Sequence, residues 1–165
     1  MPGWPEEGYQ VFETPAGPVQ AITHGVQSTA GAYVVVYADY PPDLLRGDNT
    51  EVVLNGACLG MVMNVRGIIR SCRNVELGDI AGYELEYEFP RQVGTPRGYG
   101  RARVFLIQDR LYQVFVIGTA EMVESAAART FLESFRIEGR APIVIAGSYP
   151  IGPTRPGGSQ QSLKS

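Results

Sequence analysis

The 165-residue chain has few of the side chains on which metal sites and catalytic centres most often depend. It contains two cysteines, one histidine and one tryptophan, and Lys164 is its only lysine. Two cysteines, Cys58 and Cys72, are too few for a disulfide framework or for a zinc site built from cysteines. A single disulfide between them stays open as an alternative. Because free cysteine usually behaves as a small core hydrophobe, we expect a pair of buried free thiols.

Sequence motifs of the common catalytic classes are also missing. The chain has no Gly-x-Ser-x-Gly, no Gly-rich phosphate-binding loop and no His-Glu-x-x-His. We interpret the sole histidine, His24, as an ordinary side chain and not as a general base, since no cysteine or serine motif lies near it. Asp39, Asp43 and Asp48 lack the alternating spacing of a calcium loop. The sequence therefore predicts no enzyme activity, no metal and no cofactor.

Long apolar runs and a strong net charge are absent as well. No run of about 18 apolar residues occurs, so we expect no transmembrane segment. The N-terminus lacks a basic region followed by an apolar run, which argues against a signal peptide. As written, the sequence predicts a cytoplasmic protein, or an exported one if a leader was removed. The net charge of −3 argues against nucleic acid as a partner of the whole molecule.

What the chain does contain fits one globular domain. It is 44% hydrophobic and 19% charged, which is sufficient for one packed core. Prolines and glycines at the start predict an irregular N-terminal arm over residues 1–8. Residues 9–146 would form the domain. Residues 147–165 are rich in Pro, Gly, Ser and Gln, and this composition predicts a disordered tail. The oligomeric state is left open.

The apolar periodicity predicts an α+β fold. Strands are expected over residues 19–26, 32–40, 67–77, 83–90, 98–108 and 111–118, and helices over about 50–66 and 121–135. In the fourth of these strands, apolar and acidic residues alternate: Tyr83, Leu85, Tyr87 and Phe89 face one way and Glu84, Glu86 and Glu88 the other. The glutamates would then face Arg101 and Arg103 of the next strand, in pairs that each contribute about 0.2–1 kcal/mol. These pairs account for the charge pattern without an active site.

The central hairpin is predicted to turn at Asp109 and Arg110. This turn would set Leu106 opposite Gln113 and Phe105 opposite Val114. Both faces of the hairpin are mostly apolar, so both must be covered. Two layers of helix around one mainly antiparallel sheet meet that requirement.

The two predicted helices have apolar stripes that would cover the sheet. The first helix has Val53, Ala57 and Met61 at helical spacing, and Gly56 and Gly60 would allow its close approach to the sheet. The second is expected to be continuous from 121 to 135. Its stripe consists of Met122/Val123, Ala126/Ala127, Thr130/Phe131 and Ser134/Phe135.

Three segments of the C-terminal half form a recognisable pattern: RARVFL from Arg101, RLYQVFV from Arg110, and Ala127 followed by FLESFRI from Phe131. This pattern resembles that of bacterial Mog1/PsbP-like domains, and YVVVYADYP from Tyr33 and the Gly82-Tyr83-Glu84 step are similar to it as well. The resemblance covers about residues 12–137. It implies an α/β/α sandwich around an antiparallel sheet. PsbP proteins support the oxygen-evolving side of photosystem II and Mog1 binds the GTPase Ran, so the resemblance implies binding and not catalysis. No functional residue is carried over.

The sequence supports two hypotheses about function. The first is a non-catalytic protein-binding or assembly module that docks another protein through the loop of residues 91–99 and the strand that follows. Arg91, Arg97, Tyr99 and Arg101 are the candidate contacts, because arginine and tyrosine are enriched among interface anchors. The alternative for each of these residues is a solvated side chain.

The second hypothesis is a small-molecule or lipid-binding protein with a pocket between sheet and helix. Tyr33, Tyr37, Tyr83 and Tyr87 would line that pocket, since they fall on strands expected to face the core and a buried hydroxyl needs a partner. The alternative is a filled core whose hydroxyl groups reach its rim.

Overall fold

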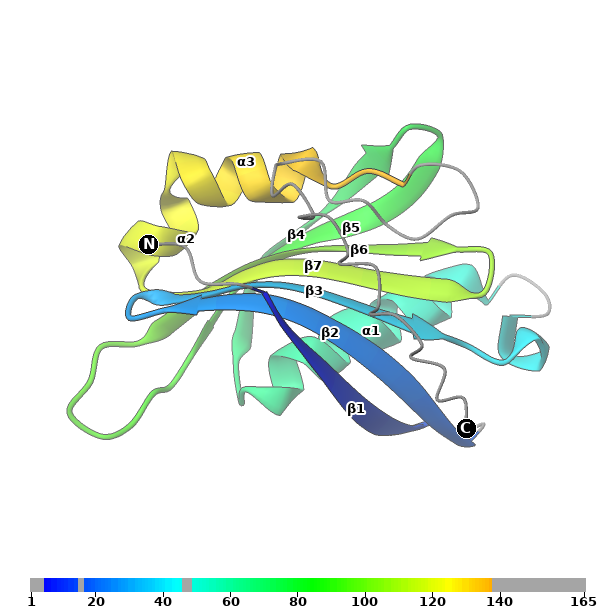
Figure 1. Ribbon diagram of the computed structural model, residues 1–165, viewed down its shortest axis with the longest axis horizontal. Coiled ribbons are helices and arrows are strands. Elements are labelled where there is room, and N and C mark those ends of the chain that lie inside the picture. Colours follow the sequence, from blue (N-terminus) through cyan, green and yellow to red (C-terminus); the bar gives the residue numbers. More distant parts are fainter. Residues whose placement is uncertain (1–4, 15–16, 46–48, 138–165) are drawn as a thin grey trace, which may run out of the picture.

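A computed structural model describes residues 5–14, 17–45 and 49–137 (Figure 1). Seven strands form one sheet in the order β1-β2-β3-β7-β6-β5-β4, and all neighbouring strands pair antiparallel. The strands are β1 (Glu6–Thr14), β2 (Gly17–Ser28), β3 (Gly31–Asp39), β4 (Ile68–Leu77), β5 (Ile80–Phe89), β6 (Gly98–Ile107) and β7 (Arg110–Gly118). The predicted α+β class with an antiparallel sheet is confirmed.

Helices lie on both sides of this sheet (Figure 1). Helix α1 (Thr50–Asn64) packs on one face, and α2 (Ala120–Glu124) and α3 (Ala126–Ser134) pack on the other; a short 3₁₀ helix, η1 (Pro42–Leu45), follows β3. Among the described residues, no helix has the length and apolar character that crossing a membrane requires.

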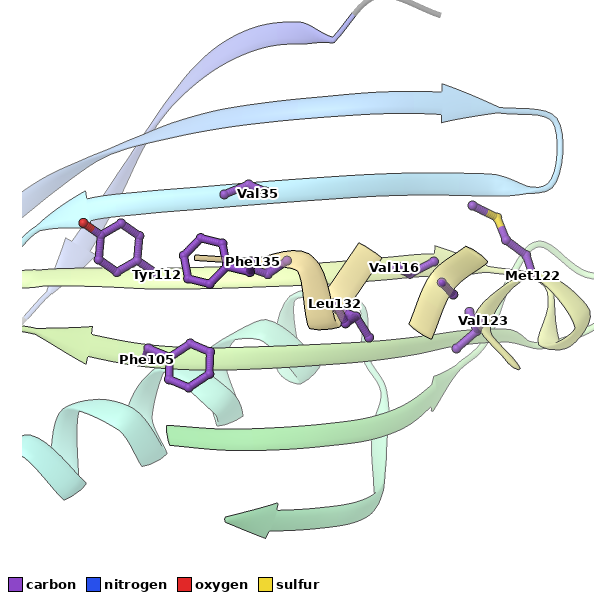
Figure 2. Close-up of a cluster of buried hydrophobic side chains, with 10 residues drawn as sticks. Val35, Phe105, Tyr112, Val116, Met122, Val123, Leu132 and Phe135 are labelled. Atoms are coloured by element: carbon purple, nitrogen blue, oxygen red, sulfur yellow. The ribbon is translucent and has the colours of Figure 1, made fainter. Parts of the chain in front are cut away.

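The sheet separates the two larger of the three hydrophobic clusters that the described residues form; the third is small and consists of Val19, Ala21 and Ala38 on β2 and β3. Figure 2 shows the core on the α2 and α3 side, where side chains from α3 lie against β3, β6 and β7. Its fully buried members include Phe105, Val116, Leu132 and Phe135, and the rings of Phe105 and Phe135 stack with centroids 6.1 Å apart. On the opposite face, α1 covers Leu85, Tyr87, Ala102, Val104, Leu106 and Leu111. Both faces of β6 are therefore buried, which explains the nearly continuous apolar run in its second half.

Aromatic rings of β5 lie over glycines of β6. Tyr87 pairs with Gly100 and Phe89 with Gly98. A Cβ at Gly100 would lie 2.1 Å from Cζ of Tyr87, and one at Gly98 would lie 2.2 Å from Cζ of Phe89. A ring can pack over the neighbouring strand in this way only where that strand has no Cβ, so both positions require glycine.

The N-terminal arm is shorter than predicted. Strand β1 begins at Glu6, and Gly8 and Tyr9 pair with Thr23 and Ile22 of β2. Pro5 precedes the strand, where its missing N–H removes no ladder hydrogen bond. Residues 6–8 therefore belong to the sheet. The predicted C-terminal tail lies outside the described residues.

The central hairpin turns one residue earlier than predicted. Gln108 and Asp109 form its turn, with φ of +57° at Gln108, so Leu106 pairs with Leu111 and Phe105 with Tyr112. The predicted pairings are wrong by two residues. Because side chains alternate with a period of two, this shift leaves every side chain on the predicted face.

The second predicted helix is divided in two at Ser125. The backbone there is extended, with ψ of 156°, so α2 ends and α3 begins at this residue. Its Oγ accepts a hydrogen bond from the backbone N–H of Ala128 and donates one to the carbonyl of Met122. Serine is a favoured N-cap residue, and that capping geometry outcompeted a continuous helix. The predicted Met122, Val123 and Phe135 are buried, but within α3 the buried positions are Ala128 and Leu132 in place of the predicted pairs 126/127 and 130/131.

Helix α1 has the predicted extent but is rotated from the predicted orientation. It buries Leu54, Cys58 and Val62 most deeply, one position after each predicted contact, and the predicted Val53, Ala57 and Met61 are half-buried against the same core. Gly56 and Gly60 face away from the sheet, and a Cβ at either would meet no atom within 4 Å. Close approach to the sheet is therefore not their role.

The cysteines do not form a disulfide. Cys58 is buried on the sheet-facing side of α1, whereas Cys72 is exposed on β4, so the expectation of two buried thiols holds only for Cys58. Burial raises the pKa of the Cys58 thiol to about 12.

Candidate docking site

Eight charged side chains of β4, β5, β6 and the loop before β6 form the most extensive polar feature of the sheet. We call it the arginine–glutamate cluster; its members are Arg70, Arg73, Arg97, Arg101, Arg103, Glu84, Glu86 and Glu88. The predicted register brings these side chains together, since Glu84 pairs with Arg103 and Glu86 with Arg101. The cluster lies on the face that carries α2 and α3, because Arg101 and Arg103 pair with Val116 and Val114 of that core.

Glu84 is the centre of this cluster. Its side chain is only 1% exposed, and three arginines donate to it. Arg101 Nη2 lies 2.7 Å from Oε1 and Arg103 Nε lies 2.6 Å from Oε2, while Arg73 also donates to Oε1. A buried carboxylate without such partners would be very costly, so these contacts are what permits its burial.

The same contacts determine the protonation state of Glu84. Burial by itself would raise the pKa of the carboxyl group, but hydrogen bonds from Arg101, Arg73 and Arg103 outweigh burial and lower that pKa to about 2. Glu84 is therefore ionised at neutral pH. The sequence pattern predicted the pairing but not the burial. Helix α3 borders the cluster, since the carbonyl of Leu132 accepts a hydrogen bond from Arg103 Nη1 at 3.4 Å.

Arg70 and Arg73 were not predicted as members of the cluster. Simple alternation along β4 places them on opposite faces, but a β-bulge between Ile69 and Ser71 shifts the register. Arg73 consequently meets Glu84, and Arg70 Nη2 lies 3.1 Å from Oε2 of Glu88. The three alternating glutamates of β5 were the available signal, because a central strand needs partners for its charges on both neighbouring strands.

A pocket lies at one end of the cluster, between the sheet and α2. Its volume is about 220 Å³. We call it the end pocket; it is lined by Arg70, Glu86, Tyr87, Tyr99, Gly100, Arg101, Ala120, Val123 and Glu124. Thr119 fixes the start of α2, since its hydroxyl oxygen accepts a hydrogen bond from the N–H of Met122. This cap holds Ala120 and Val123 over the pocket.

Three of the four residues predicted to contact a partner lie in or beside this end of the sheet. Tyr99 and Arg101 line the end pocket. Arg97 Nη1 lies 2.6 Å from Oε1 of Glu88, the glutamate that also binds Arg70. Arg91 is exposed in the loop between β5 and β6.

The four tyrosines predicted to line a single pocket do not lie together. Tyr33 and Tyr37 face the α2 and α3 side, where Tyr33 contacts Phe131 edge to face at 5.2 Å. Tyr83 and Tyr87 belong to the core under α1 on the opposite face. The alternation of each strand was predicted correctly, but the relation between the two strands was not available from the sequence. Of the four, only Tyr87 lines the end pocket.

The remaining polar candidates have structural partners. His24 stacks on Tyr37 with ring centroids 6.0 Å apart, and Arg110 Nη2 binds Oδ2 of Asp39 at 2.8 Å. Within the described ranges no three His, Cys, Asp or Glu side chains converge as metal ligands would. Asp48 lies outside those ranges.

Comparison with known proteins supports the fold alone. No protein-family model matches the chain, and no curated protein sequence matches it. Among solved structures, the chain is similar to a protein of unknown function, PA94 from Pseudomonas aeruginosa, with a TM-score of 0.51. The two share 8% sequence identity over 79% of this chain and 98% of that chain.

Proposed function

We propose that the protein is a non-catalytic protein-binding or assembly module, and that it docks its partner on the end pocket and the arginines around it. The observation that carries the proposal is the combination of exposed arginine forks with a half-buried tyrosine at one place. The side chains of Arg70 and Arg97 are 61% and 60% exposed, although both contact Glu88. Tyr99 lies half-buried in the pocket. Tyrosine and arginine are the residue types that most often anchor interfaces.

The charge of the cluster indicates the chemistry of the partner. Five arginines surround three glutamates, and Glu124 at the pocket adds one more negative charge. The excess is small, but three of the four exposed members of the cluster are arginines, namely Arg70, Arg73 and Arg97. A partner segment with a carboxylate next to an apolar side chain would satisfy both the rim and the pocket.

The size of the pocket favours a protein side chain over a free ligand. Its volume of about 220 Å³ is smaller than the roughly 300 Å³ at which small-molecule sites begin. A lipid chain needs more room still. A small-molecule site in the end pocket is nevertheless the alternative function, because the pocket does lie between sheet and helix.

The proposal includes the absence of catalysis. It is based on the surroundings of the groups whose pKa values are shifted. Glu84 is held by three arginines, and burial raises the pKa of Cys58. Neither lines the end pocket. Tyr87 does line it, but burial raises its pKa far above neutral, so the phenol is a poor acid or base there.

We also propose that the fold is of the Mog1/PsbP-like type. An antiparallel sheet with helices on both faces supports this assignment, and so does the sequence resemblance over residues 12–137. Proteins of that family act by binding, in agreement with a docking module.

A site-specific crosslink tests the proposal. A photoreactive amino acid at position 99 should capture one defined protein in source cells. The affinity of the purified pair is then measured for Arg97→Ala combined with Tyr99→Ala, which should weaken binding at least tenfold. Arg129→Ala is the matched control, because Arg129 is an exposed arginine of α3 outside the pocket. Unchanged affinity of the double variant would refute this surface, and a bound small molecule displaced by Tyr99→Ala would favour the alternative.

A further inference from the structure

Helix α1 has apolar side chains on its outer side as well as its inner side. Its sequence, TEVVLNGACLGMVMN, contains one charged residue, Glu51. The inner side is buried in the core, yet Val52, Leu59 and Met63 are 67%, 54% and 73% exposed. A helix that is apolar all round is normally covered all round. Here only the sheet side is covered by described residues (Figure 1).

The outer side has both a ridge and a notch. Successive residues of an α-helix are separated by 100°, so Val52, Leu59 and Met63 form one row. Gly56 and Gly60 lie directly beside that row, and a Cβ at either would meet no atom within 4 Å. The bare backbone at the two glycines is therefore a notch next to an apolar ridge.

We propose that this side of α1 is a homodimer interface, in which α1 of one copy packs against α1 of a second copy about a twofold axis. A symmetric interface requires a surface that is complementary to itself. The ridge of one copy would enter the glycine notch of the other, and the reverse contact would form at the same time. The inference is independent of the function proposed for the end pocket.

The chemistry of the outer side favours a second copy over a different partner. A twofold axis brings identical residues together, and the ridge and notch have no charge to repel their copies. A charged partner would gain nothing from this surface, whereas the arginine–glutamate cluster offers charges on the other face of the sheet.

The area is sufficient for a weak dimer. The exposed fractions of the three ridge residues correspond to roughly 100 Å² of solvent-exposed apolar area each, or roughly 300 Å² per copy. A standard interface buries about 800 Å² per partner, of which about 57% is apolar. The ridge supplies about two thirds of that apolar area. We therefore expect a weak, reversible dimer whose population depends on protein concentration.

Sedimentation of the full chain from about 1 µM to 1 mM tests the proposal, with three variants. Leu59→Glu places a charge on the ridge, and two such charges would meet across the axis. Gly56→Leu fills the notch but meets no atom of its own chain, so the monomer should fold with at least the wild-type helicity. Val93→Glu is the matched control, because it places the same charge on a fully exposed apolar residue of the β5–β6 loop.

We expect wild type and Val93→Glu to form the same concentration-dependent dimer. Leu59→Glu and Gly56→Leu should each raise the dissociation constant at least tenfold while circular dichroism remains that of a folded protein. A wild type that is monomeric up to 1 mM would overturn the proposal. A dimer that Gly56→Leu leaves intact would overturn it equally, because the notch would then not be in the interface.

Discussion

Replacing Glu84 by glutamine should cost most of the stability that the arginine–glutamate cluster contributes. The substitution keeps the shape of the side chain but removes the charge on which Arg73, Arg101 and Arg103 converge. Arg101 and Arg103 are only 17% and 18% exposed, so water replaces the lost partner poorly. Removing one partner of a buried ion pair typically costs about 3–5 kcal/mol. That loss is a large fraction of the roughly 5–15 kcal/mol by which a domain is stable.

The shifted pKa of Glu84 gives a second value for the free energy of unfolding that its charge contributes. The pKa is lowered from 4.5 to about 2, and each unit corresponds to about 1.4 kcal/mol, so the ionised form contributes about 3 kcal/mol. A lowered pKa means that this contribution is complete above pH 4.5 and is lost as the pH falls through 2. The stability difference between wild type and Glu84→Gln should therefore shrink by about 2 kcal/mol between pH 7 and pH 3.

Urea unfolding followed by circular dichroism at the two pH values measures both effects. The matched control is Glu86→Gln on the same strand, whose carboxylate is 50% exposed and should contribute less than about 1 kcal/mol. A loss below about 1 kcal/mol for Glu84→Gln at pH 7 would refute the reasoning. A loss of full size that is the same at pH 3 would show that the ionisation of Glu84 is not its cause.

Two further predictions concern the helices and the thiols. Ser125→Ala should lower the free energy of unfolding by about 0.5–2 kcal/mol, because the N–H of Ala128 loses its cap. Ser125→Asp should retain most of that free energy, since aspartate can also cap. Thermal melts test this, and a melting temperature of Ser125→Ala equal to that of Ser125→Asp would contradict the capping role. A thiol reagent at pH 8 should label only the exposed Cys72 in the native chain, because burial keeps Cys58 protonated. Both cysteines should be labelled in denaturant. Mass spectrometry counts the labels, and similar labelling rates for the two cysteines of the native protein would contradict this prediction.

The elements of the fold were largely predictable because their patterns are local. The alternation of tyrosines and glutamates in β5 and the apolar content of β6 and β7 depend only on neighbours in sequence. The predicted position of the hairpin turn is wrong because nothing in the sequence marks Gln108 as a residue with positive φ. The error shifts the pairing of β6 with β7 by two residues, so each side chain still lies on the predicted face of the sheet. The break at Ser125 was missed because a serine in a helical pattern can cap a new helix or continue the old one, and only tertiary packing decides.

The candidate site was predictable only in part, for a physical reason. Tyr99 and Arg101 belong to one strand, so their proximity follows from the chain itself. The addition of Arg70 depends on a bulge in β4, and the roof of the end pocket depends on where α2 packs. Contacts between distant segments of this kind are not present in local periodicity. The same limit explains why four tyrosines on correctly predicted strands were assigned to one pocket.

The order of strands divides the sheet into two meanders that are joined by a single pair of strands. Strands β1, β2 and β3 follow one another in sequence and in the sheet, as do β4, β5, β6 and β7, and only β3 against β7 joins the two groups. That pair unites residues 31–39 with residues 110–118 and encloses about half the chain. Closing so long a loop is the expensive step in chain entropy, whereas hairpins close cheaply. Each meander can thus be assembled from near neighbours, and the architecture requires only one encounter between remote parts of the chain.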